Sequence, residues 1–333
     1  MFQNQLVYSL FIFPMFIFTI FVLSKKLNLV DKPNSRKIHK TNIINVTGIV
    51  IYSYLLFIIL INKYPIQLEN IITVGFIIIL IGFADDRIEL TPKTKIVLTL
   101  FPVSYLILNG FNLTDLGKYE YIGLIKLGKF SIIFTILSVM LLMNAINYTD
   151  GTDGLLIGYS ITALLYFYFL SNKQSEYLSL FIIFIYILSI SLIFNFLPVK
   201  SGFKSFLGNA GSLFFGFFFS FILIYLYKFE DIHPAYLIWS CWLSIYDFLF
   251  VTLNRIKNKI NFSRPDKSHF HHYVLNYFSN DHIKTFIFIT FLNFVVICAG
   301  YFSSQLIGKI YSLLLFILLF PMFIFIRKKL NKH

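Results

Sequence analysis

Long apolar runs recur along almost the whole chain, with short polar segments between them. A helix needs about 20 mostly apolar residues to cross a hydrocarbon core that is roughly 30 Å thick. The runs therefore predict eleven membrane-spanning helices, at approximately residues 6–24, 44–62, 70–84, 96–109, 130–146, 155–170, 177–196, 213–227, 234–253, 285–303 and 310–326. We expect an all-α polytopic membrane protein in which residues 1–333 form one domain.

The composition of the chain supports a membrane location. Hydrophobic residues make up 58% of its 333 residues and only 15 are acidic, far from the norms of soluble proteins. The first span is not expected to be a cleaved signal peptide, because no Lys or Arg precedes it, whereas Lys25 and Lys26 follow it. Both cysteines, Cys241 and Cys298, fall inside apolar spans, so we expect no disulfide framework.

The basic residues are unequally distributed between the two sides that the eleven spans define. Loops on the side that begins with residues 25–43 hold 21 of the 28 Lys and Arg residues, and loops on the opposite side hold 7. Because Lys and Arg favour cytoplasmic loops, we expect the N-terminus outside and the C-terminus in the cytoplasm. The net charge of +13 is then explained by topology and anionic lipid, without nucleic acid.

Every dense polar cluster falls on the same, cytoplasmic side. The five clusters are DKPNSRKIHK (31–40), DDRIELTPKTK (85–95), NAINYTDGTDG (144–154), FLGNAGS (206–212) and RPDKSHFHH (264–272). A transporter is expected to place ionisable groups along a path through the middle of the membrane. Clusters gathered at one interface favour an enzyme that meets a cytosolic substrate. The outer loops are expected to be either short or bland, without a dense polar cluster.

Asp85 and Asp86 are predicted to lie where the third span reaches water. Adjacent carboxylates repel each other, so the pair suits a metal ion or a general base. The alternative is a helix end at which charge is easily tolerated. Lys95, at the start of the fourth span, either returns toward the pair or is an ordinary interfacial lysine.

The turn between the fifth and sixth spans carries Asn144, Asn147, Asp150 and Asp153 beside two glycines. Asn144 and Asn147 are three residues apart and share a helix face. Carboxylate and amide oxygens suit a hard cation such as Mg²⁺, which also binds phosphate oxygens. The amides that open the sixth span can receive an anion. The alternative is a plain Asx–Gly turn with a helix cap.

Further polar residues precede the eighth span and lie inside the ninth span, and the first of these two signals is weak. The Gly-rich segment 206–212, with Ser212 as a candidate N-cap, either cradles a phosphate or forms a turn. Asp247 lies inside the ninth span, where an unpaired carboxylate is costly. We expect it to face the bundle and to pair with Arg255 or with a cation.

Three histidines, His269, His271 and His272, follow in a basic loop. They lack the helical spacing and the cysteine partners of a zinc site. Imidazole and cationic groups at the border of a phosphate site fit this pattern better, and a solvated loop with chance histidines is the alternative.

Taken together and in this order, the motifs resemble one family, the polyprenyl-phosphate N-acetylhexosamine-1-phosphate transferases. The similarity runs from about residue 31 to residue 272. The matching residues are Asp31, Pro33, Arg36, Lys37 and His39; Asp85, Asp86, Leu90 and Lys95; Asn144, Ala145, Asn147, Asp150, Gly151, Asp153, Gly154 and Leu155; Phe194, Asn195 and Pro198; and His269, His271 and His272. Each motif alone is weakly specific, but the combination is highly specific.

The chain departs from the family pattern at two places. The first motif is usually followed by Pro-x-x-Gly-Gly, whereas here residues 45–48 keep one glycine and no proline. The family's GDxGS, whose Asp is an Mg²⁺ ligand, is GNAGS here, with Asn209 in the place of the Asp. Asn209 still offers a carbonyl oxygen but no charge. This departure leaves room for a catalytically inactive relative, although the other motifs are intact.

The resemblance implies ten or eleven helices and an Mg²⁺-dependent reaction, with Mn²⁺ as a substitute. A sugar-1-phosphate of the N-acetylhexosamine type would pass from a UDP-sugar to undecaprenyl phosphate, giving an undecaprenyl-diphospho-sugar and UMP. This product would begin a cell-envelope polysaccharide such as O-antigen. The implied location is the inner membrane with the site on the cytoplasmic face, and the implied assembly is a homodimer.

The resemblance also implies roles for individual residues. The expected catalytic residues are Asp85, Asp86, Asp150 and Asp153, and the expected metal ligands are Asn147 and Asn209. The expected substrate-binding residues are Arg36, His39, Lys95, Asn144, Asn195, His269, His271 and His272. Asp85 would deprotonate or orient the lipid phosphate, with Asp86 in support.

Two rival functions stay open. An intramembrane prenyltransferase would carry two DxxxD-type motifs, which this sequence lacks. A transporter or flippase of lipid-linked sugars would need ionisable residues in the middle of the membrane, and Asp247 near one end is the single example. The HxHH form indicates the polysaccharide-initiating branch, with GlcNAc, FucNAc or QuiNAc as the expected sugar.

Overall fold

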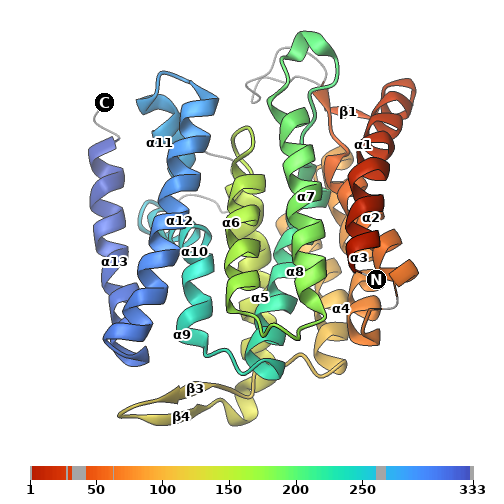
Figure 1. The fold of residues 1–333 in the computed structure, drawn as a ribbon. Helices are drawn as coiled ribbons and strands as arrows, with labels where there is room; N and C mark the ends of the chain where they lie inside the picture. Colours follow the sequence, from red (N-terminus) through yellow and green to blue (C-terminus); the bar gives the residue numbers. More distant parts are fainter. Residues whose placement is uncertain (1, 28, 32–42, 63, 260–267, 331–333) are drawn as a thin grey trace.

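Ten of the eleven expected apolar spans each form a helix of one bundle, and the ninth forms two helices joined by a 3-10 turn (Figure 1). The computed structural model describes residues 2–27, 29–31, 43–62, 64–259 and 268–330. The helices that run along the bundle are α1 (Phe2–Lys26), α2 (Thr47–Asn62), α3 (Ile66–Ile88), α4 (Pro92–Leu108), α5 (Ser131–Thr149), α6 (Leu155–Leu170), α7 (Tyr177–Phe196), α8 (Gly208–Phe229), α9 (Pro234–Leu237) with the 3-10 turn η3 (Ile238–Cys241) and α10 (Trp242–Lys257), α12 (His282–Leu306) and α13 (Lys309–Leu330).

Several of these helices are long and apolar enough to cross a bilayer. In the described part of the chain, seven segments meet both conditions, namely α3, α5 with its preceding turn η1 (Gly128–Phe130), α7, α8, α9–α10, α12 and α13, while α2 and α6 are apolar but shorter. Outer helices expose large apolar side chains, such as Leu108 and Leu306 at 83% and 80% exposure, which suits contact with lipid. The chain is a multi-pass membrane protein. The count of eleven crossings and their direction stay predictions.

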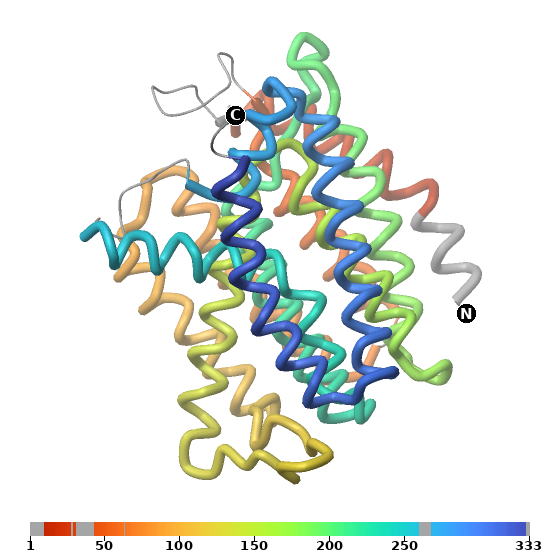
Figure 2. Tube along the Cα trace, turned by 90° about the vertical axis from the view of Figure 1, so that its left-hand side faces the viewer, coloured from red at the N-terminus to blue at the C-terminus, as the bar shows by residue number. Residues whose placement is uncertain are grey.

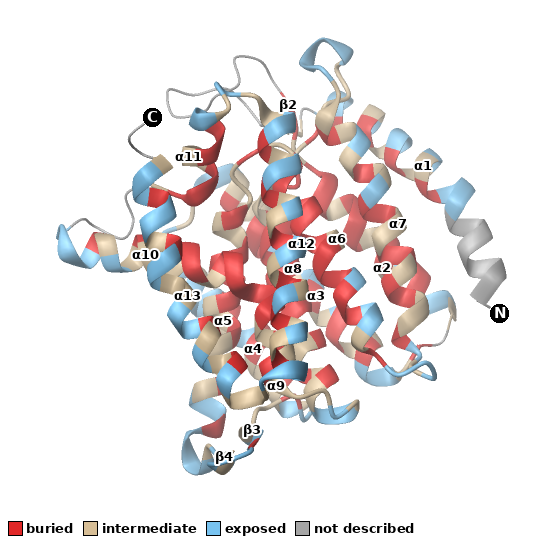
Figure 3. Cartoon of the chain, turned by 60° about the vertical axis from the view of Figure 1, so that its left-hand side comes forward, coloured by how far each residue is buried: buried red, intermediate tan, exposed pale blue. Residues whose placement is uncertain are grey.

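Helix α8 forms the centre of the bundle and packs against α2, α3 and α5. Buried residues are concentrated along these inner helices (Figure 3). A Cβ atom on Gly48 of α2 would overlap the backbone of Gly211, and one on Gly82 of α3 would overlap the backbone of Ala210. Such small residues let helix backbones approach closely inside membranes. The packing brings the C-terminal end of α3 against the N-terminal end of α8.

The structure corrects the all-α expectation at both ends of the bundle. The outer segment 109–130, expected to be bland, contains an antiparallel hairpin of β3 (Asp115–Tyr119) and β4 (Gly123–Lys126). Glu120 in its turn accepts hydrogen bonds from the backbone N–H groups of Lys309 and Ile310, at 3.0 and 3.3 Å. The hairpin therefore caps the start of α13. A second small ladder pairs β1 (Val30–Asp31) with β2 (Ile43–Ile44).

Two further segments differ from the expected pattern. The predicted ninth span is broken into α9, η3 and α10, and the C-terminal part of α10 projects from the side of the bundle (Figure 2). The HxHH motif, expected in a loop, lies at the start of a short helix, α11 (Phe270–Tyr277). A short 3-10 turn, η2 (Val199–Ser201), follows α7. In Figure 1, β1, α11 and the C-terminal end of α13 lie at one end of the bundle, and β3, β4 and α9 lie at the other.

Candidate active site

Asp86 joins the end of α3 to the start of α8. Its two carboxylate oxygens accept hydrogen bonds from the backbone N–H of Asn209, at 3.2 and 3.0 Å. Gly208 has φ +72°, and a Cβ atom there would lie 2.6 Å from Asp86 Oδ2 and 2.5 Å from Asn45 Oδ1. Only glycine fits both this conformation and this space. A carboxylate at a helix N-terminus is stabilised by the free amides and the helix dipole.

Asp85 has different partners from its neighbour. Its carboxylate lies 2.6 Å from Lys95 Nζ and accepts a hydrogen bond of 2.9 Å from the backbone N–H of Leu90. The side chain of Asp85 is buried, and that of Lys95 is half-buried. The prediction that Lys95 returns toward the acidic pair is confirmed. The two adjacent carboxylates therefore have different partners: Asp85 contacts Lys95 and the backbone of Leu90, and Asp86 contacts the backbone of Asn209.

Asn147 and Asn209, 62 residues apart, are hydrogen-bonded to each other. Asn147 Nδ2 donates to Asn209 Oδ1 at 3.0 Å and to Ser212 Oγ at 2.7 Å. The expectation that Ser212 caps the eighth span is wrong, because α8 begins at Gly208 and Ser212 lies in its second turn. The GNAGS segment is thus the first part of a helix, and its polar side chains face the end of α5.

The turn between α5 and α6 brings further negative charge to this place. Burial, together with the nearby charges of Asp86 and Asp153, raises the pKa of Asp150 to about 7. Asp153 forms an ion pair with Lys204, and its Oδ2 lies 3.6 Å from His282 Nδ1. Gly154, with φ +72°, precedes the first residue of α6. Three carboxylates therefore act on one another electrostatically, and Asp153 is directly balanced by Lys204.

The HxHH segment (residues 269–272) packs on this turn between α5 and α6, which we call the acidic turn (residues 150–154). His271 is buried, and a Cβ atom on Gly151 would overlap its Nε2 atom. Burial and the nearby His272 hold the pKa of His271 well below its usual 6.5, so its imidazole is neutral at neutral pH. The rings of His271 and His272 lie 4.3 Å apart. His271 therefore borders the acidic turn as a neutral ring. That the three histidines border a phosphate site stays a prediction.

Asp247 anchors the HxHH helix to α10. Its carboxylate accepts a hydrogen bond from the backbone N–H of Phe270 at 2.7 Å and lies 2.7 Å from His269 Nδ1. The expected partner Arg255 is replaced by Arg327 of α13, whose Nη1 donates to Asp247 at 2.7 Å. The error arises because α10 and α13 pack side by side, which sequence spacing within one span does not reveal.

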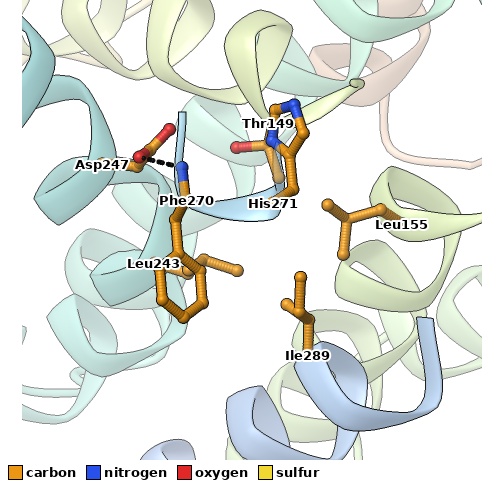
Figure 4. Close-up of a pocket in the computed structure, with 7 residues that line it drawn as sticks. All are labelled: Thr149, Leu155, Leu243, Asp247, Phe270, His271 and Ile289. Carbon is orange, nitrogen blue, oxygen red and sulfur yellow. Dashed lines mark hydrogen bonds between the residues drawn. The ribbon is translucent and has the colours of Figure 1, made fainter. Parts of the chain in front are cut away.

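A small cavity adjoins these contacts (Figure 4). It is lined by Thr149, Leu155, Leu243, Asp247, Phe270, His271 and Ile289. In Figure 4 the hydrogen bond from Phe270 to Asp247 lies on one side, and His271 beside Thr149 lies on the other. The rest of the lining is apolar, so the polar groups of the cavity are those that join α10 and α11 to the turn.

The remaining predicted residues lie elsewhere or outside the described ranges. Asn144 donates to the carbonyl oxygen of Met140 in its own helix, at 2.7 Å. Asn195 is buried and donates to the carbonyl oxygen of Ser205 at 2.8 Å, which joins the end of α7 to the segment before α8. Arg36 and His39 lie outside the described residues. Asn195 therefore connects two segments of the chain, and of the first motif only Asp31 lies within the described residues, in β1.

Three ionisable residues near the site were not predicted from the sequence, namely Lys204, His282 and Arg327. Lys204 and His282 both approach Asp153, and Arg327 approaches Asp247. In the sequence, Arg327 and Lys204 belong only to the excess of basic residues on the expected cytoplasmic side. The one available signal was that each buried or turn-borne Asp needs a partner of opposite charge.

The donor set fits a divalent cation that is shared with a substrate. Among the described residues, no three His, Cys, Asp or Glu side chains converge closely enough to hold a metal ion by themselves. Mg²⁺ commonly takes one or two carboxylates and completes its shell with water and substrate phosphates. Burial raises the pKa of Asp150, and repulsion from the nearby carboxylates of Asp86 and Asp153 adds to this effect. A bound cation would relieve that repulsion. Asp86, with the side-chain amides of Asn147 and Asn209 nearby, supplies oxygen ligands of the required kind.

Comparisons with known proteins agree with the motifs. The model of a family described as glycosyl transferase family 4 matches residues 69–227. A probable undecaprenyl-phosphate N-acetylglucosaminyl 1-phosphate transferase of Bacillus subtilis is 31% identical over 279 residues, covering 81% of this chain and 76% of the relative. An undecaprenyl-phosphate alpha-N-acetylglucosaminyl 1-phosphate transferase of Escherichia coli K12 is 30% identical over 285 residues, covering 80% and 75%.

A third relative, an undecaprenyl-phosphate alpha-N-acetylglucosaminyl 1-phosphate transferase of Yersinia pestis, is 28% identical over 281 residues and covers 82% of this chain and 76% of the relative. The agreement therefore extends over most of the helices described above. The chain belongs to glycosyl transferase family 4, among the phosphoglycosyltransferases, as a homologue of the undecaprenyl-phosphate GlcNAc-1-phosphate transferases.

Proposed function

We propose that this protein transfers N-acetylhexosamine-1-phosphate from a UDP-sugar to undecaprenyl phosphate, releasing UMP. The phosphate of the lipid attacks the β-phosphorus of the nucleotide sugar. The bond between the β-phosphorus and the bridging oxygen breaks, and that oxygen leaves with UMP. The product is an undecaprenyl-diphospho-sugar, which begins a cell-envelope polysaccharide.

One observation carries this proposal. Asp86 at the end of α3, Asn209 at the start of α8 and Asn147 at the end of α5 are joined by direct hydrogen bonds. Their helices are distant in sequence, yet their polar groups meet beside the acidic turn. Two anionic substrates need such a place, where a cation and fixed donors reduce their repulsion and hold them in line.

The side chains divide into two groups by their contacts. Asp86, Asn147 and Asn209 would hold Mg²⁺, with Mn²⁺ as a substitute, and Asp150 would add negative charge beside it. When bound, the cation would neutralise charge on the transferred phosphate. Asp85 would orient the lipid phosphate, and Lys95 would hold Asp85 in position. At neutral pH that phosphate is already largely ionised, so orientation matters more than proton removal.

The second group would bind the donor. His271 packs on Gly151 of the acidic turn, and His269 and His272 lie beside it. A neutral imidazole can donate to or accept from uridine or a phosphate oxygen. Asp153, paired with Lys204, would order the turn. By resemblance, Arg36 and His39 would contribute further phosphate contacts.

The membrane location supports a site that binds both a nucleotide sugar and a lipid phosphate. A water-soluble nucleotide and a lipid acceptor can meet only at the membrane surface. The excess of Lys and Arg on the side that carries the motifs favours the cytoplasmic face of the inner membrane. We propose eleven crossings, with the N-terminus outside and the C-terminus in the cytoplasm. The donor is proposed to be UDP-GlcNAc or a UDP-6-deoxy-N-acetylhexosamine such as UDP-FucNAc or UDP-QuiNAc.

Purified protein in detergent tests the proposal. It would be incubated with undecaprenyl phosphate, Mg²⁺ and one of UDP-GlcNAc, UDP-GalNAc, UDP-FucNAc or UDP-QuiNAc, and UMP release would be measured. We expect UMP with at least one donor and none without the lipid or in EDTA. Absence of UMP with every donor at high Mg²⁺ and Mn²⁺ would overturn the proposal and favour an inactive relative or a flippase.

A further inference from the structure

Asp247 is the centre of a buried polar cluster that lies beside the acidic turn. Its side chain is 4% exposed and has three contacts of 2.7 Å, to His269 Nδ1, to the backbone N–H of Phe270 and to Arg327 Nη1. These groups come from α10, α11 and α13. Figure 4 shows the hydrogen bond from Phe270 beside the cavity. The carboxylate of Asp247 thus connects α11 to α13.

Arg327 is unusual among the basic residues at the end of the chain. Lys328 and Lys329 are exposed, whereas Arg327 is 1% exposed. Its guanidinium lies 3.9 Å from the centre of the Phe250 ring and 4.9 Å from that of Tyr273. Aromatic faces and one carboxylate compensate a cation that has lost its water. Because burial of a charged side chain is costly, the position of Arg327 indicates a role beyond that of a basic residue that favours the cytoplasmic side.

The cluster continues from His269 to the turn. The His269 ring lies 5.2 Å from the ring of Tyr148, at the end of α5, and stacks on His271 at 5.7 Å. His271 in turn packs on Gly151. A continuous set of contacts therefore links Arg327 to the acidic turn through Asp247 and the two histidines. Each link is buried, so displacement of one member moves its neighbours.

We propose that Arg327 is a positioning residue for sugar-phosphate transfer. It holds the Asp247 carboxylate, which receives His269 Nδ1–H and so sets the orientation and tautomer of that ring. In a buried ion pair, removal of one partner leaves the other charged and uncompensated. Without Arg327, Asp247 and α11 would lose their fixed arrangement, and the histidines would no longer meet the nucleotide correctly. This inference rests on the proposed function.

A double-mutant cycle tests the inference. The variants are Arg327→Met, Asp247→Asn and the two combined, with Lys328→Met as the matched control from the same helix end. For each, the KM for UDP-GlcNAc, the KM for undecaprenyl phosphate and kcat would be measured per folded protein, with the folded fraction taken from thermal unfolding. If another UDP-sugar is the active donor, it replaces UDP-GlcNAc.

Positioning through Asp247 predicts a specific result. Arg327→Met should lower kcat/KM for the donor by roughly ten- to a hundredfold, the usual cost of losing an orienting partner. The KM for the lipid should stay within about twofold, and Lys328→Met should be neutral. The kcat/KM of the combined variant for the donor should be at most about threefold below that of the less active single variant. Multiplication of the two single effects, or an equal loss for donor and lipid, would overturn the inference.

A second measurement does not depend on transfer activity. The rate at which diethyl pyrocarbonate modifies His269 would be followed by tandem mass spectrometry. Arg327→Met and Asp247→Asn should each raise this rate by at least about threefold, with no further increase in the combined variant. An unchanged rate would overturn the inference. If the wild-type protein releases no UMP with any donor, the proposed function is wrong. The labelling rates then test by themselves whether Arg327 and Asp247 are coupled.

Discussion

Asn147 donates a hydrogen bond of 3.0 Å to Asn209 Oδ1, from the end of α5 to the start of α8. This contact occupies the place at which the family motif has an aspartate. The backbone N–H of the same Asn209 donates to Asp86. The side chain and backbone of one residue therefore join α5, α8 and α3. The substitution of Asn for Asp removes one negative charge from this junction and keeps an acceptor for Asn147.

The first prediction concerns Asn209→Asp. An aspartate can accept the hydrogen bond from Asn147 as well as an asparagine does, and it adds negative charge where the cation would bind. We expect activity to be kept and the Mg²⁺ concentration for half-maximal UMP release to fall by about three- to tenfold, on the order of 1 kcal/mol. Asn209→Ala, which removes the acceptor, should need more Mg²⁺. Complete loss of activity in Asn209→Asp would contradict this account.

The second prediction concerns Lys95→Met. Asp85, which is 4% exposed, would lose its ammonium partner at 2.6 Å. Because Lys95 is partly solvated, we expect a loss of only about 1–2 kcal/mol in the free energy of unfolding. Turnover should fall at least about tenfold, since Asp85 would no longer be held in place. The exposed Lys93, two residues earlier, provides the control Lys93→Met. Equal effects of the two substitutions would refute the proposed role of the pair.

The third prediction concerns the contact between the acidic turn and α11. Gly151→Ala would place a methyl group on His271 Nε2, so we expect a loss of about 1–3 kcal/mol in stability, as for other overpacked sites, together with lower activity. His271→Ala removes the obstacle. The double variant Gly151→Ala/His271→Ala should therefore be no less stable than His271→Ala alone. A further loss in the double variant, measured by thermal unfolding, would show that the clash lies elsewhere.

The fourth prediction concerns pH in the presence of EDTA. The pKa of Asp150 rises from its ordinary 3.8 to about 7 in the folded protein. Between these two values the folded state binds more protons than the unfolded state, so Asp150 lowers the free energy of unfolding as the pH rises, and its cost is complete above the folded pKa. Relative to Asp150→Asn, the wild type should lose about 1.4 kcal/mol per pH unit from about pH 5 to about pH 7. Parallel stability curves for the two proteins would contradict the raised pKa.

The helices themselves could be predicted from sequence because an apolar run of sufficient length has few other solutions in a bilayer. Their polar ends could not. Hydropathy ended the third span at residue 84, whereas α3 continues through Asp85 and Asp86 to Ile88. It began the eighth span at residue 213, whereas α8 begins at Gly208. Ion pairs and hydrogen bonds made across helices extend both elements into polar sequence.

The candidate site was predictable as a set of motifs but incomplete as a set of contacts. Asp85 with Lys95, and Asn147 with Asn209, were expected on the same side and do meet. Arg327 was not distinguishable from its exposed neighbours Lys328 and Lys329, because all three suit a cytoplasmic helix end. Its burial depends on the rotation of α13 against α10, and nothing in the local pattern encodes that rotation.

The most direct test of the account is the fate of the β-phosphate. Purified protein would receive undecaprenyl phosphate, Mg²⁺ and the active donor, labelled with ³²P at the β-phosphate, and the organic and aqueous phases would be separated. Transfer of a sugar-1-phosphate predicts that the label enters the lipid phase in a one-to-one ratio with UMP released. Label that stays in the aqueous phase as UDP, with only the sugar on the lipid, would contradict the central claim.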